Sequence, residues 1–166
     1  MIGYFSLYKS ENETYAGGFL ILNEKGIPVS FKYTDPVKPT RIQKIIYGNN
    51  LKNYFAFEIL TNKDLFSPHD VEIIFTDDKD ILNYADIEKT IIYLIEVNSD
   101  VGFGVKEKEG VIPIDENKSL KFYSTKIVDS TLLKKIRSYA EVFDLLEPFR
   151  RLKEALIYIC SSEEKE

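Results

Sequence analysis

The chain of 166 residues contains one cysteine, one histidine, one methionine and no tryptophan. Cys160 has no second cysteine with which to form a disulfide or a thiolate metal cluster, and this pattern predicts a reducing compartment. His69 stands alone beside Pro68, which excludes multi-histidine zinc sites and relays. We interpret His69 as a surface residue, because a general base needs an orienting partner and a nucleophile within reach.

Long apolar runs and targeting signals are also missing. The longest apolar stretches, such as residues 90–95, are far too short to span a bilayer. Residues 1–5 have neither the basic start nor the small-residue cleavage site of a secretory signal. We therefore expect a soluble, cytoplasmic protein with no membrane partner.

Cofactor and nucleophile motifs are absent as well. Gly102-Phe103-Gly104 follows an apolar run, but Glu107 stands where a dinucleotide fingerprint needs its third glycine. The sequence contains no phosphate-binding loop and no GxSxG pattern. We therefore expect no cofactor.

The residues that are abundant indicate a stable globular chain. Hydrophobic residues make up 44% of the sequence, enough for one core without disulfides or a metal. Lysine, glutamate and isoleucine are frequent, a bias typical of proteins from hyperthermophiles. We predict a single domain over residues 1–160 and a frayed tail at 161–166.

The first third reads as three strands of an antiparallel meander, over residues 4–9, 15–23 and 29–34. Gly26 closes the turn before the last strand, where a positive φ is needed. In that strand Val29, Phe31 and Tyr33 alternate with polar residues, which predicts a solvated polar face that carries Lys32.

A stiff loop and two helices follow the meander. Pro36 and Pro39 restrict the loop, and Thr40 is placed to cap a helix that ends at Gly48. Ile42, Ile45 and Ile46 fall on one face, the pattern of an amphipathic helix. Asn50 is placed to cap the second helix, whose predicted buried stripe is Leu51, Tyr54, Phe55 and Ile59.

The rest of the chain alternates between strands and helices. Residues 71–76 and 90–97 are apolar runs typical of strands buried on both faces of an α/β sheet. A hairpin over residues 101–114, a strand over 120–128 and two C-terminal helices complete the pattern. We predict an α/β or α+β fold: one domain with an N-terminal antiparallel meander, central helices, a mixed sheet and two C-terminal helices.

Charge is distributed unevenly along the chain. Residues 25–52 contain six cations and one acid, whereas residues 58–100 contain eleven acids and three lysines. Lysine side chains and the start of a helix at Thr40 and Arg41 are suited to an anionic group. The alternative is that these lysines only solvate the surface. We call the candidate anion-binding residues the basic sector: Lys32, Tyr33, Lys38, Thr40, Arg41, Lys44 and Tyr47.

Acidic residues follow two neighbouring predicted strands. Carboxylates at the carboxyl ends of such strands can hold Mg²⁺ for phosphoryl transfer. The alternative is that they are turn and helix-cap residues. The candidate metal ligands are Asp77, Asp78, Asp80, Glu96 and Asp100.

Two resemblances extend this interpretation. The blocks Gly17–Gly26, Pro28–Phe31 and Pro36–Gly48, with Glu147–Leu152 near the C-terminus, resemble a group of bacterial conserved hypothetical proteins, and this resemblance implies no activity. The order of three meander strands, a helix and two buried strands resembles ribonuclease H-like domains. The strand Tyr4–Lys9 has no acidic residue, although nucleases of that fold place their first metal ligand there.

The sequence thus favours a non-catalytic binding or interaction domain whose basic sector meets an anionic partner, with nucleic acid as one candidate. A metal-dependent phosphoryl-transfer or nuclease-like enzyme that uses the acidic residues is the first alternative. A purely structural or interaction protein is the second.

Overall fold

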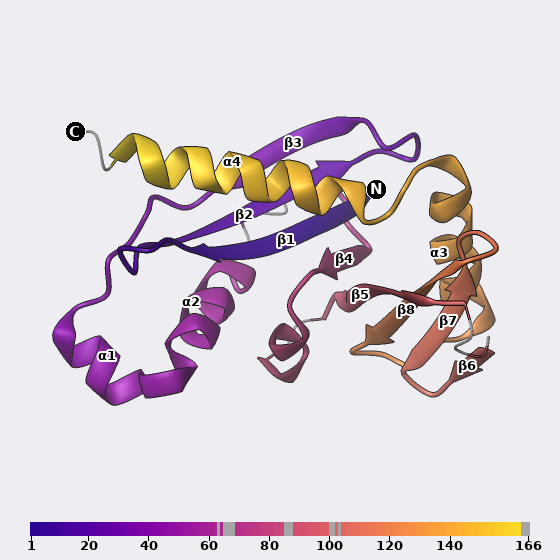
Figure 1. The fold of residues 1–166 in the computed structure, drawn as a ribbon, viewed down its shortest axis with the longest axis horizontal. Coiled ribbons are helices and arrows are strands. Elements are labelled where there is room, and N and C mark those ends of the chain that lie inside the picture. Colours follow the sequence, from indigo (N-terminus) through magenta and orange to yellow (C-terminus); the bar gives the residue numbers. More distant parts are fainter. Residues whose placement is uncertain (63, 65–68, 85–87, 100–101, 103, 164–166) are drawn as a thin grey trace.

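Eight strands lie in one sheet within the part of the chain that the computed structural model describes: residues 1–62, 64, 69–84, 88–99, 102 and 104–163 (Figure 1). Their spatial order is β3-β2-β1-β4-β5-β8-β7-β6. The strands are β1 (Ile2–Lys9), β2 (Tyr15–Leu22), β3 (Pro28–Tyr33), β4 (Ile73–Thr76), β5 (Thr90–Asn98), β6 (Gly104–Lys106), β7 (Glu109–Pro113) and β8 (Lys118–Ser124).

The sheet is mixed. β1, β2 and β3 form an antiparallel meander, whereas β4 lies parallel both to β1 and to β5. β8, β7 and β6 then extend the sheet, each antiparallel to its neighbour. The predicted meander and mixed sheet are therefore confirmed, and the chain is a single α/β domain.

Helices pack on both faces of the sheet (Figure 1). They are α1 (Arg41–Tyr47), the 3₁₀ helix η1 (Gly48–Asn50), α2 (Leu51–Leu60), the 3₁₀ helix η3 (Lys79–Tyr84), α3 (Ser130–Val142) and α4 (Glu147–Glu163). The two predicted C-terminal helices are α3 and α4, and α4 runs three residues beyond its predicted end at Cys160. No described helix is long and apolar enough to cross a membrane.

α4 covers β1 and β2 on one face of the sheet. Leu152 and Leu156 are buried there in the larger core cluster, together with Ile136 of α3. A Cβ atom on Gly18 of β2 would lie 2.7 Å from Leu152 Cδ1, so the close approach of α4 requires glycine at this position. On the opposite face, Ala56 and Leu60 of α2 are buried in a second cluster.

Local signals in the sequence account for several element boundaries. Thr40 and Gln43 form a capping box at the start of α1, and the Asp129 carboxylate accepts a hydrogen bond from Leu132 N at the start of α3. Gly26 and Gly48 have φ angles of 78° and 52°, as the turn and helix end require. Asn50 precedes α2 as predicted, but its side chain makes no capping hydrogen bond.

The predicted orientation of β3 is wrong. Val29, Phe31 and Tyr33 are the exposed residues of this strand, whereas Lys32 is only partly exposed. β3 is an edge strand that lies beyond the area covered by α4, so its apolar residues are left uncovered. Lys32 lies on the other face, where its Nζ donates a hydrogen bond to the Asp64 carbonyl oxygen.

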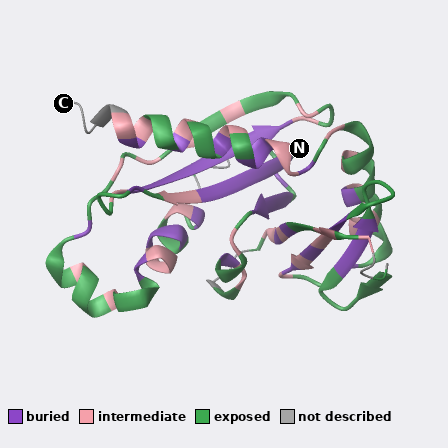
Figure 2. Cartoon of the chain, in the orientation of Figure 1, coloured by how far each residue is buried: buried purple, intermediate pink, exposed green. Residues whose placement is uncertain are grey.

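The isoleucines of α1 are not packed against the domain. Ile42, Ile45 and Ile46 are 71%, 68% and 73% exposed, and no residue of this fully described helix is buried. α1 lies at a corner of the molecule, and Figure 2 shows it almost entirely exposed beside buried central strands. The amphipathic pattern correctly predicts the helix, but the apolar face that it defines is turned to solvent.

Candidate functional site at the carboxyl edge of the sheet

The carboxyl ends of β1 and β4 meet at the centre of the sheet. β1 pairs antiparallel with β2 on one side and parallel with β4 on the other, so the strand order reverses between β1 and β4. Open α/β sheets bind ligands outside the carboxyl ends of the strands at such a reversal. This edge is therefore the first place to look for a functional site.

Ser6 and Asp77 are hydrogen-bonded at this edge. Phe5 pairs with Thr76 in the parallel register, which brings the next residue of each strand together. The Ser6 hydroxyl donates to the Asp77 carboxylate, with distances of 3.1 and 3.2 Å to its two oxygens. A serine of β1 therefore occupies the position next to the first acidic residue after β4.

Asp77 carries an unfavourably placed charge. Desolvation of the carboxyl raises its pKa, although the residue as a whole is exposed. The hydrogen bond from Ser6 lowers this pKa in part, the nearby Asp78 raises it and Lys52 lowers it. Perturbed carboxyl groups in such places are candidates for functional residues.

Asp78 and Asp80 make local contacts of the kind expected for turn residues. Asp78 forms an ion pair with Lys52 of α2, and its Oδ1 accepts a hydrogen bond from Asp80 N at 3.0 Å. The ion pair links the first turn of α2 to the acidic residues that follow β4. The acids that follow β4 are thus partly neutralised by a residue that sequence reasoning did not include in the site.

Of the remaining two candidate metal ligands, Glu96 does not join this group. Glu96 lies three residues beyond Tyr93, the register partner of Thr76, and forms a 3.1 Å ion pair with Lys118 of β8. Asp100 lies outside the described residues. Among the residues that the structure describes, no three histidine, cysteine or acidic side chains come together as a metal site.

Two tyrosines extend the edge toward β8. The rings of Tyr93 and Tyr123 stack across β5 and β8 with centroids 6.0 Å apart, and Lys79 Nζ lies 4.5 Å from the Tyr123 centroid. Burial raises the pKa of Tyr93, as do Tyr123, Asp78 and Asp77. No sequence pattern indicates this pair, because it depends on the register between two distant strands.

Part of the basic sector gathers at the end of the β1–β2 hairpin. Lys44 forms an ion pair with Glu13 in the hairpin turn, and this contact lowers the pKa of Glu13. Lys9 and Lys38 also lower that pKa by their charge. Lys44 therefore contacts this carboxylate directly, and the charges of Lys9 and Lys38 also act on it. Lys9 was missed in the sequence because it lies outside residues 25–52.

The remaining residues of the basic sector are dispersed. Lys32 and Tyr33 are neighbours in β3 and so point to opposite faces of the sheet, with Tyr33 stacked on Phe31 at 5.5 Å. Tyr47 stacks on Tyr54 of α2 at 4.2 Å. The basic sector is therefore not one continuous surface.

The start of α1 is less suited to an anion than the sequence suggested. The Thr40 hydroxyl accepts from Gln43 N, and the Gln43 side chain accepts from Thr40 N. The capping box thus satisfies two of the backbone donors, and the helix has only seven residues. Arg41 is exposed and forms no ion pair with a described residue.

Comparisons with known proteins bear on the fold. No family model and no curated protein matches the sequence, so the resemblance to a bacterial group stays a prediction. One solved structure of similar fold is a variant of endonuclease V from Ciona intestinalis, in complex with a 23-mer DNA that contains an inosine followed by a ribo-adenosine. The two structures match with a TM-score of 0.56 and 11% sequence identity. The match covers 99% of this chain and 86% of that chain. The fold is ribonuclease H-like.

A second solved structure is Marinitoga piezophila Argonaute in complex with a 5′ OH guide RNA, with a TM-score of 0.41 and 14% identity over 83% of this chain and 24% of that chain. The ribonuclease H-like element order expected from the sequence is confirmed at the level of the fold by the endonuclease V comparison. In β1, a strand without acidic residues, Ser6 is the residue that contacts Asp77.

Proposed function

We propose that this chain is a nucleic-acid-binding domain in which Lys9, Lys38, Arg41 and Lys44 contact the phosphate backbone. The observation that carries the proposal is the ion pair of Lys44 with Glu13 in the hairpin turn, where the charges of Lys9 and Lys38 also act on that carboxylate. The ribonuclease H-like fold and the DNA present in the endonuclease V structure support nucleic acid as the anionic partner. Phosphate contacts of this kind position a ligand without reading its sequence.

Fluorescence anisotropy with labelled single-stranded DNA, RNA and duplex DNA tests the proposal. Three to four phosphate contacts give a log–log salt slope of about −2 to −3 for single strands. Arg41→Ala should weaken binding of all sequences similarly and reduce the slope by about one, because a guanidinium can contact phosphate with two donors. Lys38→Ala should act in the same direction.

Two matched variants serve as controls. Arg150→Ala removes an exposed arginine of α4, and Lys32→Ala removes a lysine whose Nζ donates to the Asp64 carbonyl oxygen. Neither should change the salt slope. Undetectable binding at low salt, or equal effects of Arg41→Ala and Arg150→Ala, would leave the basic sector as a solvated surface of a structural protein.

Within the described part of the chain, the residues at the carboxyl edge do not fit a divalent cation. The Asp77 carboxylate accepts a hydrogen bond from Ser6, Asp78 is paired with Lys52, and β1 places a serine and not a third carboxylate beside them. We therefore derive no metal-dependent step. Thermal unfolding with millimolar Mg²⁺ or Mn²⁺ checks this, since a ligand at a hundredfold excess over its Kd stabilises the fold by about 2.7 kcal/mol. A metal-induced rise in Tm that Asp77→Asn abolishes would favour the nuclease-like alternative.

A further inference from the structure

The exposed face of α1 needs a covering surface. Ile42, Ile45 and Ile46, here called the isoleucine face, are each about 70% exposed and adjacent on one side of the helix. Contiguous exposed apolar side chains of this kind mark interaction surfaces. Lys44 lies on the opposite side of α1, in its ion pair with Glu13, so it does not interrupt the isoleucine face.

The surroundings of the isoleucine face are cationic. Residues 37–57 contain four cations and no acid. Arg41 adjoins the isoleucine face, and Lys38 precedes the helix. A matching partner surface is therefore concave, partly apolar and acidic.

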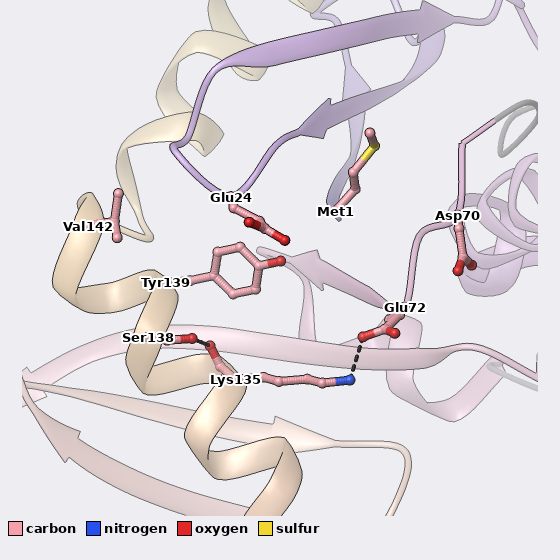
Figure 3. Close-up of a pocket in the computed structure, with 8 residues that line it drawn as sticks. All are labelled: Met1, Glu24, Asp70, Glu72, Lys135, Ser138, Tyr139 and Val142. Atoms are coloured by element: carbon pink, nitrogen blue, oxygen red, sulfur yellow. Dashed lines mark hydrogen bonds and ion pairs between the residues drawn. The ribbon is translucent and has the colours of Figure 1, made fainter.

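The domain itself carries such a surface at the amino edge of its sheet. A hollow of about 660 Å³ is lined by three acids and by apolar atoms (Figure 3). Lys135 is paired there with Glu72, and Met1 and Val142 are 40% and 56% exposed. We call this place the amino-edge hollow; its lining residues are Met1, Glu24, Asp70, Glu72, Lys135, Ser138, Tyr139 and Val142.

The electrostatics of the hollow are net acidic. Glu24, Asp70 and Glu72 stand against Lys135 and the N-terminal ammonium of Met1, which leaves one negative charge in excess. The hydrogen bond from Lys135 lowers the pKa of Glu72, and the charge of the amino terminus lowers it further. Burial raises the pKa of Tyr139, Glu24 and Glu72 raise it further, and Lys135 lowers it in part. Cations at the rim of the isoleucine face complement this charge.

The two surfaces lie at opposite ends of β1. Met1 lines the hollow, whereas Lys9, at the other end of this eight-residue strand, lies beside Glu13 and the Lys44 of α1. Eight strand residues span roughly 25 Å, so α1 cannot reach the hollow of its own chain. A second copy of the chain can fill the hollow, because its α1 supplies both an apolar face and the cations Arg41 and Lys38 beside it.

We infer that α1 of one copy seats its isoleucine face in the amino-edge hollow of the next, with Arg41 and Lys38 directed toward Glu24, Asp70 and Glu72. Because the two surfaces differ, the contact is heterologous and generates a chain or ring of copies. The isoleucine face is small beside a standard interface of about 800 Å² per partner, so the association is weak and concentration-dependent. It is also weakened by salt.

Sedimentation velocity of the full chain without nucleic acid tests this, independently of the proposed function. The face variant is Ile42→Ser with Ile45→Ser and Ile46→Ser; the hollow variant is Glu24→Lys with Val142→Arg. All five side chains are exposed, so both variants should fold, and both keep Arg41. The wild type should grow beyond a dimer as concentration rises, and each variant alone should stay monomeric.

An equimolar mixture of the two variants gives the decisive result. The face variant retains an intact hollow and the hollow variant an intact α1, so one contact per pair forms and the mixture should sediment as a dimer and nothing larger. Tyr158→Ser, at a 73% exposed residue of α4, is the control and should assemble like the wild type. A wild type that stays monomeric at millimolar concentration, or a mixture that forms no dimer, overturns the inference. So does a monomeric wild type whose isoleucine face binds lipid vesicles.

Discussion

α4 and α1 are both amphipathic in sequence, but only α4 buries its apolar side chains. Leu152 and Leu156 of α4 are 1% and 0% exposed, whereas the three isoleucines of α1 are about 70% exposed. α4 has seventeen residues and lies along β1 and β2, where the absence of a side chain at Gly18 lets it approach. α1 has seven residues and touches chiefly α2 and η1.

The difference shows what an apolar stripe can and cannot predict. Apolar residues at helical spacing indicate that one face of the helix is apolar, but they do not indicate which surface covers that face. For α4 the cover is the sheet of the same chain. For α1 we infer a second copy of the chain as the covering surface. The apolar face of α4 therefore has a structural role, whereas that of α1 is an interaction surface in our inference.

Leu156→Ala should have the largest effect on stability. The side chain is fully buried between α4 and β2, so its truncation removes apolar contacts and leaves a cavity, which costs about 2–5 kcal/mol. Unfolding in guanidinium chloride measures the loss. Ile157→Ala, at the neighbouring and 41% exposed position, is the matched control and should lose much less. Equal losses at the two positions would contradict the described placement of α4.

Tyr4→Phe should have the next largest effect. The Tyr4 hydroxyl donates a buried hydrogen bond of 2.7 Å to the Leu145 carbonyl oxygen just before α4, and its ring packs edge-on against Phe149. Removal of the hydroxyl leaves that carbonyl without this donor and should cost about 1–3 kcal/mol of unfolding free energy. Tyr158→Phe is the control at an exposed ring of α4. A neutral Tyr4→Phe would mean that the start of α4 is held by packing alone.

The strands and helices were predictable where local chemistry decides them. α1 begins at the capping box of Thr40 and Gln43 and ends at Gly48, and Gly26 closes a turn. These boundaries were predictable because caps and turns depend on a few adjacent residues. The orientation of β3 was not predictable, because it depends on how far α4 extends across the sheet. The parallel pairing of β1 with β4 is likewise a long-range property.

The candidate site shows the same limit. Lys38 and Lys44 were predicted from charge along the chain, but Lys9 joins them only through the fold of the hairpin. Ser6 and Asp77 come together because β1 and β4 pair in parallel in one particular register, and no sequence pattern predicts that register. Ion pairs between distant segments, such as Lys52 with Asp78, are equally invisible in the sequence, and they decide which charges are already neutralised.

Gly48→Ala should have a smaller effect than either change near α4. Gly48 has a φ of 52°, and a Cβ atom added there would meet no neighbouring atom within 4 Å, so the substitution strains the backbone without a clash. We expect a loss of about 1–2 kcal/mol if α1 unfolds together with the rest of the domain, because residues other than glycine rarely adopt a φ of 52° with a ψ of −125°. The same chemical unfolding curve measures it. An unchanged free energy of unfolding would show that α1 and η1 form outside the main cooperative unit, which sharpens the contrast with α4.

Ile45→Ser should have the smallest effect on the stability of the monomer. Its side chain is 68% exposed and belongs to a helix with no buried residue, and exposed substitutions of this kind usually change stability by less than about 0.5 kcal/mol. The measurement belongs at low protein concentration, where copies do not associate. A loss above about 1 kcal/mol would mean that the isoleucine face is already covered within one copy. The near-neutral result, set beside the large loss for Leu156→Ala, would show that of two similar apolar stripes only that of α4 contributes to the folding of the monomer.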